Sequence, residues 1–100
     1  MDGIETRHYL IFYDICDPKR LRKVAEWIEN FAYRVQLSVF EAELDEKTFN
    51  KLLKGLKPLI DDIWDSVYII PICSSDWKRR ERYGATGMSE MIYNQSCVVL

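Results

Sequence analysis

Residues 34–44, RVQLSVFEAEL, constrain the fold of this chain more than any other segment. In an extended chain, the apolar residues of this segment lie on one side up to Val39 and on the other side from Phe40 onward. Two strands with a tight connection around Leu37 and Ser38 would produce this change of side, and so would one long strand kinked by a bulge. We favour two short antiparallel strands.

An almost wholly apolar run, YLIFYDI at residues 9–15, precedes this segment and ends in the carboxylate of Asp14. Its length and its β-branched and aromatic content predict a strand buried on both faces. Asp17 can then cap a helix that has Pro18 in its first turn. Apolar residues at three- and four-residue spacing predict that this helix ends near Asn30; they are Leu21, Val24, Ala25, Ile28 and Phe31.

A second helix and a further strand follow the predicted hairpin. Asp45 can cap the helix, and Gly55 and Pro58 predict a kink or an early stop in its second half. Residues 66–73, SVYIIPIC, have the composition of a strand. Pro71 cannot donate a hydrogen bond to a neighbouring strand, so it predicts an edge position or a strand end.

The order strand, helix, strand, strand, helix, strand is that of the ferredoxin-like α+β sandwich, with a four-stranded antiparallel sheet and two helices on one face. We therefore expect one domain over residues 1–100, with a core at about 7–83 and a mobile loop at 84–95. The apolar end of the chain at 96–100 is predicted to add a strand to the sheet of a second copy in a homodimer.

The formal net charge is −2, but the basic residues are clustered. One cluster lies at residues 19–23 and the other at 78–82, and both suit a nucleic-acid backbone, although a solvated helix face is the commoner explanation of the first. Three cysteines without a Cys-x-x-Cys pair and a single histidine exclude a zinc site built by one chain. No apolar run approaches 18 residues, so we expect a soluble, cytoplasmic protein with no membrane partner.

Residues 13–44, YDICDPKRLRKVAEWIENFAYRVQLSVFEAEL, closely resemble the small CRISPR-associated endonucleases that form the second of the two core spacer-acquisition proteins. In that family a strand ends in Tyr-Asp-Ile and leads into a basic helix. A second motif, Arg-Val-Gln-x-Ser-Val-Phe-Glu, is found here at residues 34–41. Ala32 departs from the pattern, since the family often has glycine in the turn before this motif.

The resemblance implies a homodimer with a nuclease activity that depends on Mg²⁺ or Mn²⁺. It also implies that Asp14 of each subunit reaches a shared cleft and holds the metal. Two carboxylates that face each other at low dielectric repel strongly, and a divalent cation relieves that repulsion while it polarises a phosphoryl oxygen and activates water. Without the resemblance, Asp14 would more often be a turn or cap residue.

Four further positions match family residues: Tyr13, Arg34, Ser38 and Phe40. As hypotheses, Arg34 neutralises developing phosphorane charge, Ser38 donates a hydrogen bond to a phosphate, and Phe40 packs in the cleft or against a sugar or base. For Tyr13 and Phe40, a place in the core or the interface is an equally good interpretation.

Two functions of different class fit these residues. In the first, the protein hydrolyses phosphodiester bonds of RNA or DNA through metal held by Asp14. In the second, a dimer bridges copies of the CRISPR integrase and holds duplex spacer DNA while the integrase does the chemistry. Both use the same predicted backbone contacts, Arg20, Arg22, Lys78 and Arg79. A regulatory domain that binds a small ligand is a weaker third alternative, because it gives Asp14 no role.

Overall fold

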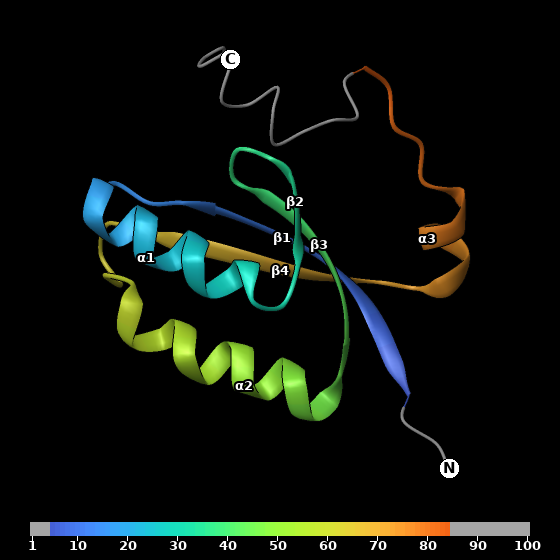
Figure 1. Ribbon diagram of the computed structural model, residues 1–100, viewed down its shortest axis with the longest axis horizontal. Helices are drawn as coiled ribbons and strands as arrows, with labels where there is room; N and C mark the ends of the chain where they lie inside the picture. The colour runs from blue at the N-terminus through green and yellow to red at the C-terminus, as the bar shows by residue number, and fades with distance from the viewer. Residues whose placement is uncertain (1–4, 85–100) are drawn as a thin grey trace.

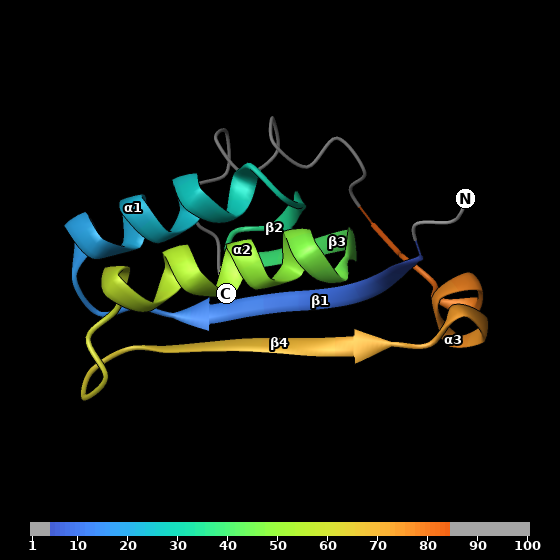
Figure 2. The same cartoon turned by 90° about the horizontal axis from the view of Figure 1, so that it is seen from below.

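The computed structural model describes residues 5–84 of the chain, and these form a four-stranded sheet with two helices across one face (Figures 1 and 2). The strand order is β2-β3-β1-β4, and every neighbouring pair is antiparallel. The elements in chain order are β1 (Thr6–Asp14), α1 (Pro18–Glu29), β2 (Tyr33–Gln36), β3 (Val39–Asp45), α2 (Glu46–Leu56), the 3₁₀ turn η1 (Lys57–Leu59), β4 (Ser66–Ile72) and α3 (Ser74–Arg79). The predicted ferredoxin-like α+β fold is confirmed.

Both long helices begin at the predicted caps. The Asp17 carboxylate accepts a hydrogen bond from the Arg20 amide at 3.0 Å, and the Asp45 carboxylate accepts one from the Thr48 amide at 2.7 Å. The second helix ends at Leu56 and continues only as the 3₁₀ turn that contains Pro58. The predicted early stop of this helix is therefore confirmed.

The hairpin is present as two strands joined at Leu37 and Ser38, as we favoured. Its register also shifts between Arg34 and Gln36, so the first of the two strands is irregular as well. A tight turn and an irregular strand therefore both occur in this segment. The two features are compatible because the shift lies within β2 and the turn follows it.

The core lies between the sheet and the two long helices. Its buried residues are Tyr9, Ile11, Tyr13, Val24, Ala25, Ile28, Phe40, Ala42, Leu44, Leu52 and Leu56. Every second residue of β1 from Tyr9 to Tyr13 belongs to it, whereas His8, Leu10 and Phe12 point to the opposite side and are only half-buried. The prediction that this strand is buried on both faces is wrong for the single chain, because both long helices pack on the same side of the sheet.

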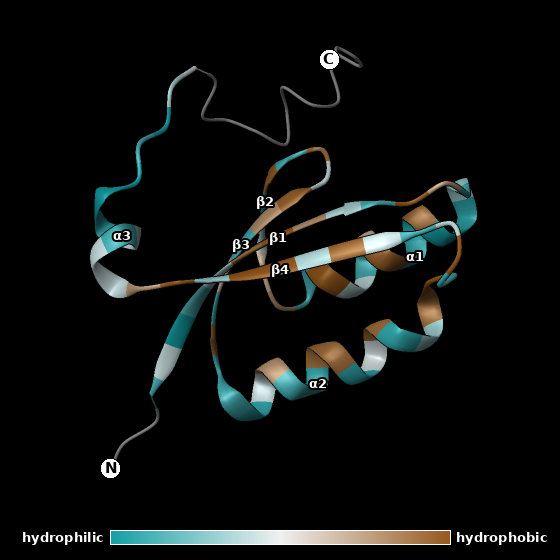
Figure 3. Ribbon diagram, turned by 180° about the vertical axis from the view of Figure 1, so that it is seen from behind, coloured by the Kyte–Doolittle hydropathy of each residue, from teal (hydrophilic) through white to brown (hydrophobic). Residues whose placement is uncertain are grey.

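We call the side of the sheet opposite α1 and α2 the open face; Figure 3 shows it, with hydrophobic residues along β1 and β4. The rings of Phe12 and Tyr68 stack there at 5.0 Å, although the Tyr68 side chain is half exposed. The strand β4 is an edge of the sheet, as Pro71 predicts. No helix within residues 5–84 is long and apolar enough to cross a membrane.

The sequence patterns did not predict α3, which follows β4 directly. The ring of Trp77 stacks on His8 at 4.3 Å, and the Arg80 guanidinium lies 3.7 Å from the Trp77 ring centroid. Stacking on the sheet therefore stabilises this short helix. The predicted terminal strand at 96–100, and all but the first residue of the predicted loop at 84–95, lie outside the described residues.

Candidate functional site

Asp14 is the last residue of β1, and its side chain is exposed. It lies opposite Ser66 of β4 in the antiparallel register. Because side chains alternate along a strand, Asp14 lies on the same side of the sheet as Phe12, at the end of the open face. The sheet thus fixes the backbone of a solvent-accessible carboxylate.

Tyr13 precedes Asp14 and points to the other side of the sheet. Its ring lies 6.0 Å from that of Phe40, which is wholly buried in the core. Burial raises the pKa of the Tyr13 hydroxyl, while the nearby Arg34 cation acts in the opposite direction. Of the two interpretations left open for Tyr13 and Phe40, the geometry of the single chain favours the core.

Arg34 lies over Phe40 on this same side, with its guanidinium carbon 5.1 Å from the ring centroid. It forms an ion pair with Glu29 at 2.8 Å and donates a hydrogen bond to the carbonyl of Leu37, also at 2.8 Å. The carbonyl of Ser38 accepts a hydrogen bond from the Tyr13 amide at 3.3 Å. These contacts hold the turn between β2 and β3 against the end of β1.

The structure therefore brings three of the five predicted catalytic residues, Tyr13, Arg34 and Phe40, together on the side of the sheet away from the Asp14 carboxylate, and Ser38 lies in the adjoining turn. Asp14 is also the only carboxylate proposed as a metal ligand. Within residues 5–84 no three His, Cys, Asp or Glu side chains lie close enough together to form a metal site. One carboxylate fits a hydrated Mg²⁺, which commonly keeps several waters, but the remaining ligands would be water, substrate or a second copy of the chain.

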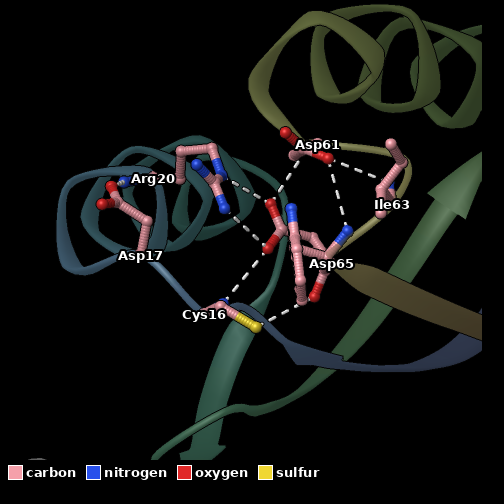
Figure 4. Close-up of polar contacts among 7 residues, drawn as sticks. Cys16, Asp17, Arg20, Asp61, Ile63 and Asp65 are labelled. Carbon is pink, nitrogen blue, oxygen red and sulfur yellow. Dashed lines mark hydrogen bonds and ion pairs between the residues drawn. The ribbon is translucent and has the colours of Figure 1, made fainter.

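Asp65, just before β4, is a polar centre that the sequence analysis missed (Figure 4). Its side chain is fully buried and accepts hydrogen bonds from the Cys16 and Asp61 amides at 3.1 and 2.9 Å. The Arg20 guanidinium donates two more, at 2.7 and 3.1 Å. The Arg20 hydrogen bond is the main reason that the pKa of this carboxyl lies far below its usual range. The only signal in the sequence was a group of acids at 61–65.

The predicted backbone-binding residues divide between two places. Arg20 and Arg22 lie at the start of α1, and Lys78 and Arg79 lie in α3, at the other end of the sheet (Figure 1). Arg20 is occupied by Asp65, and Arg79 forms an ion pair with Asp76 at 2.6 Å. Arg22 and Lys78 are exposed. One chain therefore presents two separate basic regions instead of a continuous track.

Comparison with known families gives the decisive observation. Residues 7–80, which include nearly the whole described sheet and its helices, match the family model described as CRISPR associated protein Cas2. This chain belongs to the Cas2 family. The resemblance in residues 13–44 is thereby confirmed, and the match extends it to β4 and α3.

Curated Cas2 relatives are similar to this chain over most of its length. A Cas2 from Rhodospirillum rubrum, named a CRISPR-associated endoribonuclease, is 38% identical over 78% of this chain, and the match spans 63% of that relative. One from Moorella thermoacetica, also named an endoribonuclease, is 38% identical over 77% of this chain and 85% of its own length. A Cas2 from Thermus thermophilus is named an endonuclease and is 39% identical over 66% of this chain and 73% of its own.

Solved structures with the Cas2 fold agree. The crystal structure of a hypothetical protein, TT1823, from Thermus thermophilus has a TM-score of 0.73 and 34% identity, covering 81% of this chain and 94% of that one. The crystal structure of Streptococcus pyogenes Cas2 at pH 6.5 has a TM-score of 0.69 and 32% identity, covering 77% of this chain and 99% of that one. The arrangement of the sheet and its helices is thus a Cas2 arrangement.

Proposed function

We propose that this protein is a metal-dependent endonuclease of CRISPR spacer acquisition, and that it acts in the cytoplasm as a homodimer. The observation that carries the proposal is the exposed carboxylate of Asp14 on the open face of a Cas2 sheet. Relatives named endoribonuclease or endonuclease support the reaction class. The open face beside Asp14 has exposed apolar side chains, including Tyr68 and Ile70, and a second copy would remove them from water.

In this proposal each subunit contributes one Asp14 carboxylate to a shared cleft, where the pair holds Mg²⁺ or Mn²⁺. When bound, the cation supplies charge stabilisation at the scissile phosphate and a more acidic water. The chain itself supplies orientation, because β1 is paired on both sides and holds the backbone of Asp14 in place. One carboxylate per chain predicts weak metal binding in the absence of nucleic acid.

The other predicted catalytic residues act in two ways. Tyr13 and Phe40 position the end of β1 from the core side, since both are buried. Arg34 and Ser38 remain proposed phosphate contacts. Arg34 forms an ion pair with Glu29 in the free protein, so its guanidinium must leave the Glu29 carboxylate before it can bind a phosphate.

The substrate in this proposal is a nucleic acid, either RNA or double-stranded DNA, gripped by its backbone. Arg22 and Lys78 are exposed and suited to that contact, and Arg79 becomes available if it leaves Asp76. Arg20 is the weakest of the four candidates, because Asp65 already accepts two hydrogen bonds from its guanidinium.

The test is cleavage of labelled single-stranded RNA and duplex DNA by wild type and Asp14→Asn, with Mg²⁺, with Mn²⁺ and with a chelator. We expect metal-dependent cutting in the wild type and its loss in the variant. Asp62→Asn is the matched control, because Asp62 is an exposed aspartate that makes none of the hydrogen bonds to Asp65. Cutting that is equal in wild type and Asp14→Asn would overturn the proposal.

A second candidate function, the adaptor that bridges integrase subunits and holds duplex spacer DNA, is favoured by one specific observation. Tyr13, Phe40 and Arg34 lie on the opposite side of the sheet from the Asp14 carboxylate, and Tyr13 and Phe40 are inaccessible to a ligand. An Asp14→Asn variant that cannot cut but still supports spacer capture with the integrase would make the adaptor function primary.

The proposed dimer has its own test. Residues 96–100 carry the apolar end of the chain, which we propose pairs with the partner's sheet. Deletion of these residues is expected to weaken the dimer in sedimentation velocity, whereas substitution of Ser89 by alanine in the polar segment before them serves as a control. An unchanged dimer after the deletion would refute strand exchange.

A further inference from the structure

The loop before β4 presents two large apolar side chains to solvent. Ile63 is 83% exposed and Trp64 is 66% exposed, whereas Trp27 and Trp77 are half-buried. Leaving an indole ring in water forgoes a large burial energy, so its presence at a loop tip suggests a contact that the isolated chain does not make. We call residues 61–65 the tryptophan loop.

The backbone of the tryptophan loop is held firmly. The Asp61 carboxylate accepts hydrogen bonds from the amides of Ile63 and Trp64 at 2.9 and 3.3 Å, and the Asp65 amide donates to the Asp61 carbonyl at 2.9 Å. Arg20 anchors Asp65 from α1 (Figure 4). These contacts fix the position from which the Trp64 ring projects, so little further ordering of the loop is needed on binding.

The loop is also held beside the candidate carboxylate. The strand pairing places Asp14 opposite Ser66, and just beyond both strand ends the Cys16 thiol donates a hydrogen bond to the Trp64 carbonyl at 3.0 Å. Trp64 is therefore anchored at the same end of the sheet as Asp14.

The start of α1 supplies cations that suit a nucleic-acid backbone at this end of the sheet. Arg20 joins this helix to the tryptophan loop through Asp65, and the first two turns expose Lys19, Arg22 and Lys23. Asp14 and Asp62 are exposed here as well, whereas the carboxylates of Asp61 and Asp65 are used in hydrogen bonds within the loop and with Arg20. An exposed aromatic ring beside basic side chains is the usual combination for single-stranded nucleic acid, in which cations contact the backbone and the ring stacks on a base.

We propose that Trp64 stacks on an unpaired base of the substrate and thereby positions the adjacent phosphate at Asp14. This inference rests on the proposed function and narrows its substrate class to single-stranded nucleic acid or a frayed end. Bases inside a duplex are already stacked on their neighbours and offer no free face to the ring. Trp64 is thus a positioning residue for the substrate, and Asp14 remains the metal ligand.

The test measures binding without cleavage, in the Asp14→Asn background. The probes are a fluorescently labelled oligoadenylate, an abasic strand of the same length and a duplex. Trp64→Ala is expected to weaken oligoadenylate binding by about 5-fold to 150-fold, the range for loss of one stacked base, and to leave the abasic strand and the duplex unchanged. Trp64→Phe should retain part of the affinity. Quenching of indole fluorescence by oligoadenylate should be present with Trp64 and much reduced in Trp64→Phe.

Ile63→Ala is the matched control, because Ile63 is an even more exposed apolar side chain in the same loop and has no ring to stack on a base. An equal loss of affinity in Ile63→Ala, or an equal loss for the abasic strand, would overturn base stacking. A weaker dimer in Trp64→Ala by sedimentation would likewise overturn it in favour of an interface role. Selective loss of oligoadenylate binding in Trp64→Ala, together with a wild type that retains Asp14 and cuts no substrate, would refute the nuclease and retain the stacking site.

Discussion

Arg20 donates two hydrogen bonds to the carboxylate of Asp65, which lies 45 positions later in the chain, at 2.7 and 3.1 Å. This contact joins the first turn of α1 to the loop before β4. The amide of Cys16, two residues after Asp14, donates to the same carboxylate at 3.1 Å. The pair therefore holds three segments together at the end of the sheet that carries the candidate site.

Arg20→Ala is expected to lower the midpoint of thermal unfolding by more than about 5 °C, because it leaves a buried carboxylate without its cation. The unfolding midpoint of Arg20→Lys should lie between those of the wild type and Arg20→Ala, since an ammonium group cannot replace the two parallel guanidinium hydrogen bonds. Circular dichroism during heating measures both. Arg22→Ala, an exposed position on the same helix, is the control. Equal midpoints for Arg20→Ala and Arg22→Ala would show that the pair contributes no stability.

The same pair predicts how stability depends on pH. The pKa of Asp65 is lower in the folded than in the unfolded state, so the pair stabilises fully above the unfolded-state pKa of about 4 and progressively less as the pH falls below it. Urea unfolding at pH 7, 5, 4 and 3 should show Asp65→Asn less stable than the wild type at neutral pH, with the difference shrinking below pH 4. A stability difference between wild type and Asp65→Asn that stays constant down to pH 3 would contradict the lowered pKa of Asp65.

Gly55→Ala should destabilise the protein, although alanine is normally the better helix residue. A Cβ at this position would overlap the Trp27 ring, whose Nε1 donates to the Leu52 carbonyl at 3.0 Å. Overpacking of this kind costs about 1–3 kcal/mol in the free energy of unfolding, measured by urea titration. In a Trp27→Phe background the smaller ring should relieve the overlap, so that Gly55→Ala becomes neutral or stabilising. A loss of the same size in both backgrounds would contradict this explanation.

Phe40→Leu tests whether the family phenylalanine supports the core or touches substrate. Because its side chain is wholly buried, the change should cost about 1–2 kcal/mol in the free energy of unfolding. At a temperature where the variant remains folded, nucleic-acid binding should stay close to that of the wild type. Filter binding beside urea unfolding separates the two effects. Unchanged stability with lost binding would assign Phe40 to the substrate instead.

Trp77→Ala should release α3 from the sheet, because Trp77 lies between His8 and Arg80 in the stack that holds this helix. The basic side chains at 78–82 are already exposed, but local opening makes the backbone beside them accessible to trypsin, so cleavage there should become several-fold faster. Mass spectrometry of timed digests locates the cut. Tyr83→Ala, at a side chain that is 84% exposed, is the control and should digest at the wild-type rate.

Local patterns were sufficient for most elements of the fold. Asp17 and Asp45 marked the helix starts, Pro58 marked the end of α2, and the change of side after Val39 marked the hairpin. Each of these signals depends on residues within a few positions of one another. The Tyr-Asp-Ile and Arg-Val-Gln motifs supplied the family, which the match over residues 7–80 confirmed.

The sequence by itself determined the order of the elements as far as β4 and the family, and it placed Asp14 at a strand end. Only the tertiary structure decided which partners the charged side chains take. Arg20 pairs with Asp65 and Arg80 with Glu41, at separations of 45 and 39 positions. Arg20, a predicted phosphate contact, therefore has a structural role in the folded chain. The physical reason is that helix caps and strand alternation follow from short-range backbone geometry, whereas an ion pair between distant segments exists only where packing has already brought those segments together.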